Sequence, residues 1–238
     1  SAIRAPPPPA GTEGHTDFRA MSDQLYQYTT TTSGSLAGLR GALDQFSDEA
    51  SDQIQEALDQ TDRMLELLDD LLSQADSGLS QSIETLEDTV SSIQTKLRRV
   101  RTHYQTMVEE LENLKQYVAD VARLVAAGEF EEALGLPFPS VDLKGHCTAM
   151  AVGVEEAIHL AARLPGEWSK IYDHTSNELN ETGKAMNEAQ DALDEALTAL
   201  NQAWDGTSDA VGEELDVVSS EADHIRDLLK SYTDSLGD

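Results

Sequence analysis

The chain has 238 residues, with 45 Asp or Glu against 16 Lys or Arg, so its formal charge is −29. Apolar residues make up 39% and aromatic residues 5%, less than one large compact core normally contains, while regularly spaced Leu, Ile and Val argue against disorder. Because so acidic a chain repels phosphates, we expect no nucleic-acid partner. The longest apolar run, residues 149–154, is too short to cross a bilayer, so we expect membrane attachment only through segments outside this chain.

Residues 1–15 predict a flexible tail. They contain Pro6-Pro7-Pro8-Pro9 together with Gly11 and Gly14, and such a stretch favours an extended conformation without an apolar face to bury.

Residues 16–127 contain no proline, and apolar residues recur there at alternating steps of three and four. This spacing predicts a long helical arm with a heptad seam. Thr29 to Gly34 and Asp76-Ser77-Gly78 interrupt the pattern, and because the seam resumes in phase after both, we expect kinks near residues 33 and 78 rather than turns. The seam includes Phe18, Leu25, Leu36, Leu43, Phe46, Ile54, Ala57, Leu65, Leu68, Leu72, Ile83, Leu97, Met107, Leu114 and Val125.

Residues 128–165 change character and predict a tip with a loop and one short helix. Pro137 and Pro139 end the first arm, and a helix from about Thr148 to Leu164 is expected to stop at Pro165-Gly166. A second seam follows over residues 166–236, from Trp168 to Leu236. The sequence therefore predicts an all-α fold, an elongated antiparallel coiled-coil hairpin of two long arms.

The register of that hairpin can be predicted from a basic cluster, Lys96-Leu97-Arg98-Arg99-Val100-Arg101. Folding the arms about a central tip sets the cluster beside Asp191, Asp194 and Glu195, and charges that flank a seam help to select a register. We prefer this intramolecular pairing to the alternative, a surface patch for an anion or a partner.

No combination of residues in the sequence argues for catalysis. Two Glu-x-x-His spacings, Glu156 with His159 and Glu221 with His224, occur in di-metal helical bundles, but the first arm supplies no inward carboxylates to complete such a site. His146-Cys147 is a two-ligand fragment without a matching pair. We therefore expect no enzymatic activity, no catalytic metal and no cofactor, and the single cysteine forms no internal disulfide.

Partner recognition is expected at the tip, because irregular segments on rigid supports build specific contacts. The first arm is longer than the second, so residues 18–56 lack a partner arm. They are expected to find cover by self-association, by folding back at Gly34 or Gly78, or from parts outside this chain. The alternative for the tip is that its apolar residues only cap the coiled coil. The tip residues in question are Phe130, Leu136, Phe138, Val141 and Leu143.

Two resemblances extend this interpretation. Trp204-Asp205-Gly206 resembles the Trp-x-Gly hairpin motif of small helical substrates of type VII secretion, which would imply a turn at Gly206, although the seam passes through it in phase. The long Leu, Ile and Val seams, set among Asp, Ser, Thr and Gln with few Lys, resemble the coiled-coil ectodomains of bacterial multi-spanning envelope proteins of the phage-infection-protein or lipid-exporter type.

The second resemblance implies a non-enzymatic, extracytoplasmic or cell-surface stalk of a larger bacterial membrane protein, which presents its tip to a protein or shapes a conduit. A type VII substrate and a coiled-coil scaffold are the alternatives.

Overall fold

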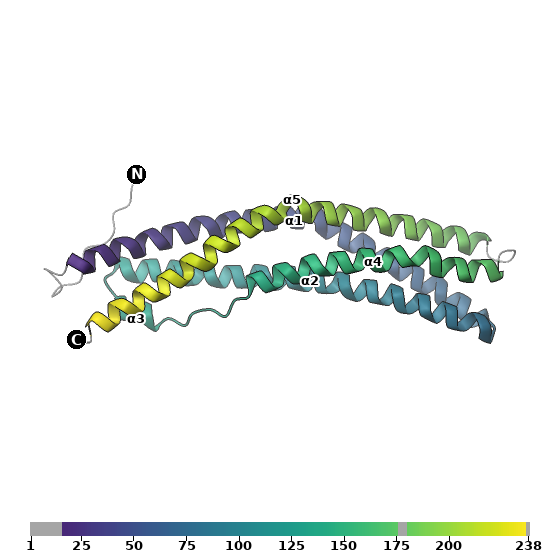
Figure 1. Cartoon of the computed structure of the whole chain (residues 1–238), viewed down its shortest axis with the longest axis horizontal. Coiled ribbons are helices and arrows are strands. Elements are labelled where there is room, and N and C mark those ends of the chain that lie inside the picture. Colours follow the sequence, from purple (N-terminus) through teal and green to yellow (C-terminus); the bar gives the residue numbers. More distant parts are fainter. Residues whose placement is uncertain (1–15, 176–179, 237–238) are drawn as a thin grey trace. The chain divides into compact units, whose positions relative to one another are not determined.

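The computed structural model describes residues 16–175 and 180–236. Within these residues the chain is all-α, without strands, and consists of α1 (Thr16–Gln74), α2 (Ser77–Ala126), α3 (Phe130–Gly135), α4 (Leu143–Thr175) and α5 (Asn180–Leu236) (Figure 1). None of the described helices combines the length and the apolar character needed to span a membrane. The expected tail, residues 1–15, lies outside the described residues.

The helices form two compact units. The first unit holds the described residues up to Leu43, Met107–Lys144 and those from Ser208 onward, and the second unit holds Asp44–Thr106 and Gly145–Thr207. The first unit therefore contains parts of α1, α2 and α5, all of α3 and the first two residues of α4, and the second contains parts of α1, α2, α4 and α5.

In the second unit, neighbouring helices pack antiparallel. Gln94 of α2 donates a hydrogen bond to Asp62 of α1, and Arg63 of α1 approaches Glu188 of α5 at 3.8 Å. On the other side of α2, Lys96 is 2.6 Å from Glu156 of α4, and Figure 1 shows these two helices side by side. The described part of this unit is thus a four-helix arrangement in which α2 lies between α1 and α4.

The first unit pairs α1 with α2 and with α5. Arg40 of α1 donates a hydrogen bond to Glu112 of α2 at 2.8 Å, and the ring of Tyr28 lies 4.9 Å from that of His224 of α5. Leu25, Leu36, Leu39 and Leu43 of α1 are buried within this chain. The first arm therefore finds within this chain the apolar cover that it was expected to need.

The predicted kink near residue 78 is wrong, because the chain turns there between two antiparallel helices. α1 ends at Gln74 and α2 begins at Ser77, and Asp76 caps α2 by accepting hydrogen bonds from the N–H groups of Gly78 and Leu79 at 3.1 and 3.0 Å. A heptad in phase on both sides does not distinguish a kink from such a turn. Near residue 33, by contrast, α1 continues as one helix.

The predicted helix stop at Pro165-Gly166 is also wrong, since α4 continues from Leu143 to Thr175 with Pro165 inside it. A proline removes one backbone hydrogen bond, at a cost of about 3 kcal/mol in a helix interior. Here Leu164 and Trp168 are buried on either side of it while Pro165 itself is exposed. Burial of the flanking side chains offsets the cost and lets the helix pass through.

The end of α2 was predicted correctly, at the start of the glycine- and proline-containing segment. Gly128 has a positive φ of 76°, its N–H bonds to the Val125 carbonyl at 3.0 Å, and the Glu129 N–H bonds to the Leu124 carbonyl at 2.9 Å. These two bonds close the helix as a Schellman motif, for which glycine is the favoured residue.

Candidate functional site

A pocket in the first unit lies between residues 138–144 and the helices α2 and α5. Its volume is about 260 Å³. The floor is apolar and the rim carries two carboxylates and one ammonium group. The lining comes from α2, from residues 138–144 and from α5, namely Leu114, Phe138, Val141, Asp142, Leu143, Lys144, Val218, Ser219, Ala222 and Asp223.

Phe138 holds the loop against both helices. Its ring meets that of Tyr117 of α2 edge to face, with centroids 5.2 Å apart, and the guanidinium of Arg226 of α5 lies 5.0 Å from the Phe138 ring centroid. Both arrangements are favourable for an aromatic quadrupole. Burial raises the pKa of the Tyr117 hydroxyl, and the charge of Arg226 opposes that rise, so Tyr117 stays neutral beside the pocket.

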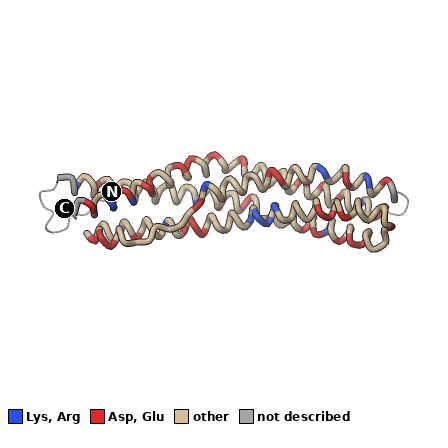
Figure 2. Tube along the Cα trace, turned by 60° about the horizontal axis from the view of Figure 1, so that its bottom comes forward, with Lys and Arg blue, Asp and Glu red and all other residues tan. Residues whose placement is uncertain are grey.

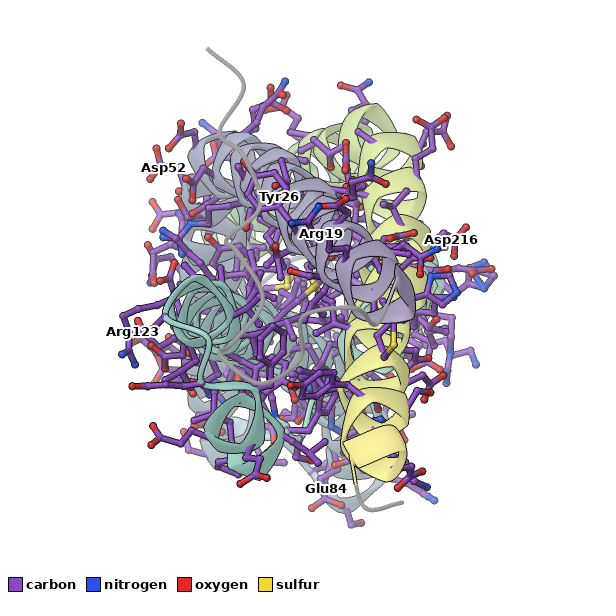
Figure 3. All side chains as sticks on the ribbon, turned by 90° about the vertical axis from the view of Figure 1, so that its left-hand side faces the viewer. Arg19, Tyr26, Asp52, Glu84, Arg123 and Asp216 are labelled. Carbon is purple, nitrogen blue, oxygen red and sulfur yellow. The ribbon has the colours of Figure 1, made fainter. Side chains whose placement is uncertain are left out.

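The start of α4 fixes the polar rim. The backbone N–H of Asp142 donates to Glu110 of α2 at 3.2 Å, and Lys144 lies 2.9 Å from Asp216 of α5. The loop is therefore tied to one helix through its backbone and to the other through an ion pair. Figure 3 shows Asp216 pointing outward from α5, where an exposed pair of this kind contributes little stability.

The structure brings three of the five predicted tip residues together. Phe138, Val141 and Leu143 line the pocket. Phe130 lies apart from it, buried against Tyr232 of α5 with ring centroids 4.5 Å apart, and Leu136 is half-buried outside the pocket lining. Phe130 thus packs against a helix, as in the capping alternative, while partner binding by the other residues stays a prediction.

Sequence reasoning missed the contribution of α5 to this pocket. Val218 and Ala222 belong to the seam that the heptad pattern found, but Ser219 and Asp223 read as ordinary surface residues. Their role depends on the return of residues 138–144 across α2 and α5, which periodicity does not encode. The sequence feature that could have revealed this contribution is the seam, because it places the apolar residues Val218 and Ala222 on the face of α5 that meets residues 138–144.

The two Glu-x-x-His spacings do not converge on a metal site. Glu156 pairs with Lys96, and His224 lies 3.7 Å from Glu221 of its own helix. Across the described residues, no group of three or more His, Cys, Asp or Glu side chains is placed to hold a metal ion.

The predicted pairing of the basic cluster with Asp191, Asp194 and Glu195 is not formed. Lys96 pairs with Glu156 of α4 instead, and Arg98 and Arg99 are exposed. Burial, and then the neighbouring charge of Asp191, raise the pKa of Asp194, whereas a nearby arginine would lower it. Figure 2 shows how sparse the basic residues are among the acidic ones.

The turn that the type VII resemblance implies at Gly206 is absent, since α5 is one helix through that residue. Trp204 is buried, and its ring meets Phe46 of α1 edge to face at 5.4 Å between centroids. The tryptophan therefore acts here as a core residue of the second unit.

Comparisons with known proteins do not place the chain in a family. No family model matches it, and no curated protein matches it. Solved structures match the chain at low sequence identity and low TM-score. The haptoglobin-hemoglobin receptor of Trypanosoma congolense matches at 14% identity over 91% of this chain and 94% of its own, with a TM-score of 0.27. A metacyclic invariant surface protein from Trypanosoma brucei matches at 13% identity over 83% and 98%, with a TM-score of 0.23. At these TM-scores neither match informs the function of this chain.

Proposed function

We propose that this chain is a non-enzymatic, antiparallel coiled-coil stalk of a larger membrane-anchored envelope protein, exposed at the cell surface, which contacts a protein partner. The pocket in the first unit carries this proposal. The coiled-coil seams and the acidic surface, which resemble those of envelope ectodomains, support the stalk and its location.

The size and lining of the pocket favour a protein partner over a small metabolite. Pockets for small ligands commonly measure about 300–1,000 Å³, whereas this one measures about 260 Å³, which suits one bulky side chain. The floor of Leu114, Phe138 and Val218 is apolar, and anchor side chains in such pockets carry much of the affinity of protein interfaces.

The charge around the pocket indicates which partner segment fits. Asp142 and Asp223 stand on the rim, and the chain as a whole carries −29. A partner segment with an apolar anchor next to Lys or Arg is therefore favoured, both in the complex and during the approach.

Photo-crosslinking tests the proposal in the full-length parent protein in its own cells. A benzophenone amino acid replaces Val141, which lines the pocket, and the covalent adduct is identified by mass spectrometry. Ser219→Trp fills the pocket and should abolish the adduct. Ser220→Trp, at the adjacent exposed position of α5, is the matched control and should leave it. An adduct that persists in Ser219→Trp, or no protein adduct at all, would contradict the proposal.

The surface location has its own test. A protease added to intact cells should cleave the chain if it is exposed at the surface, and full protection of the chain while a known surface protein is cleaved would refute that part of the proposal.

A further inference from the structure

Two histidine side chains from neighbouring helices of the second unit meet head to head. The Nδ1 atoms of His103 on α2 and His146 on α4 are 2.9 Å apart, and the ring centroids are 5.2 Å apart with the planes at 45°. Both side chains are half-buried. At this distance one ring carries hydrogen on Nδ1 and donates it to the lone pair of the other.

We propose that His103 and His146 form a two-imidazole site for a divalent transition-metal ion of the zinc class. Imidazole nitrogen is a ligand that Zn²⁺, Ni²⁺ and Cu²⁺ accept readily. Two nitrogens bound to one Zn²⁺ at about 2.0–2.1 Å with a tetrahedral angle lie about 3.4 Å apart. The observed 2.9 Å separation needs to open by only about 0.5 Å, which rotation of two half-buried rings supplies.

The exchange of proton for metal balances without any co-reactant. In the hydrogen-bonded pair the donor ring carries its proton on Nδ1, and when the ion takes both Nδ1 lone pairs that proton moves to Nε2 of the same ring. Both imidazoles stay neutral, and the site gains the two positive charges of the ion.

The two imidazoles leave the coordination sphere of the ion open. The chain as a whole carries a net charge of −29, which attracts cations to its surface. The described residues supply no group of three ligands, and water or a group from a partner completes the sphere. The bound ion clamps α2 to α4 and is not catalytic.

Thermal unfolding followed by circular dichroism tests the site on the full chain after treatment with a chelator. Zn²⁺ at about 100 times its Kd should raise Tm by about 5–10 °C. His103→Gln and His146→Gln should each lose this shift. His159→Gln, at an exposed position on α4, is the matched control and should keep it. Mg²⁺ prefers oxygen ligands and serves as a control for general screening of the acidic surface. It should change the Tm of all four proteins equally.

A second measurement on the unmodified chain removes any doubt about the folding of the variants. In a Zn²⁺ titration followed by NMR, the imidazole resonances of His103 and His146 should shift together and before those of the other histidines. Equal Tm shifts in all four proteins, no shift in the unmodified chain, or earlier movement of other histidines would overturn the proposal.

Discussion

At Gly153, α4 approaches α2 closely. A Cβ atom built on Gly153 would stand 2.7 Å from Cγ2 of Val100, whereas a Cβ on Gly166 of the same helix meets nothing within 4 Å. Valine is branched at Cβ and has one strongly preferred rotamer in a helix, so Val100 cannot simply turn away. The change Gly153→Ala therefore tests the packing of the two helices directly.

The expected magnitudes follow from two opposing effects. Replacing glycine by alanine inside a helix stabilises the folded state by about 1 kcal/mol, and forcing an extra methyl group into a packed contact costs about 1–3 kcal/mol. Gly166→Ala should thus raise the free energy of unfolding by about 0.5–1 kcal/mol, while Gly153→Ala should leave it unchanged or lower it by up to about 2 kcal/mol.

Urea unfolding followed at 222 nm measures both variants, with the slope m checked for constancy. The double variant Val100→Ala with Gly153→Ala isolates the contact. Without the clashing methyl groups of Val100, the glycine replacement should be stabilising relative to Val100→Ala alone. If Gly153→Ala alone stabilises the protein as much as Gly166→Ala does, α2 and α4 do not pack as closely at this point as the structure shows.

Three further predictions concern single side chains. Burial and the hydrogen bond to Asp69 raise the pKa of Glu87 from 4.5 to about 7, so the folded state holds this proton more tightly than the unfolded chain does. The resulting contribution to the free energy of unfolding is complete below pH 4.5 and is lost as the pH rises through 7. After allowance for solvent screening it is about 1 kcal/mol. Glu87→Gln should remove this pH dependence of the free energy of unfolding, measured by urea unfolding from pH 4.5 to 8. Asp76→Ala removes the cap of α2 and should lower the free energy of unfolding by about 1 kcal/mol, and an unchanged urea midpoint would refute the cap. Phe46→Ala leaves a cavity beside Trp204 and should cost about 3–5 kcal/mol by the same measurement, with a loss below 1 kcal/mol contradicting that packing.

The apolar seams were largely predictable because burial of each seam residue is a local consequence of helical period. Leu43, Ile83 and Leu97 are fully buried as the pattern predicts. The pattern failed in several places along α1. For example, it passed from Ala57 to Leu65, which is half-buried, while the structure buries Thr61 and Met64. The Thr61 hydroxyl donates to the Leu58 carbonyl at 2.8 Å. A polar residue satisfied by its own helix can occupy a core position.

The pocket was only partly predictable, because it depends on which helices the loop crosses. Composition indicated that Phe138 and Val141 lie on irregular backbone, but their neighbours follow from the turn at residues 75 and 76, which sends α2 back along α1. Once that turn is known, α4 returns along α2 and places His146 beside His103. Because the heptad pattern does not reveal that turn, the sequence alone offers His146 no partner.

The failure of the charge-based register shows which force selects the helix pairing. The Arg40–Glu112 bridge joins side chains that are 39% and 52% exposed, and exposed pairs of this kind contribute about 0–1 kcal/mol each. Burying one leucine contributes about 1.5–3 kcal/mol, so a register that buries the seams outweighs one that matches arginines with carboxylates. Arg98 and Arg99 accordingly stay exposed, and Lys96 takes the carboxylate, Glu156, that the apolar register brings within its reach. In a chain with 45 acidic side chains, a basic residue finds a carboxylate in many registers, so charge complementarity carries little information about which one forms.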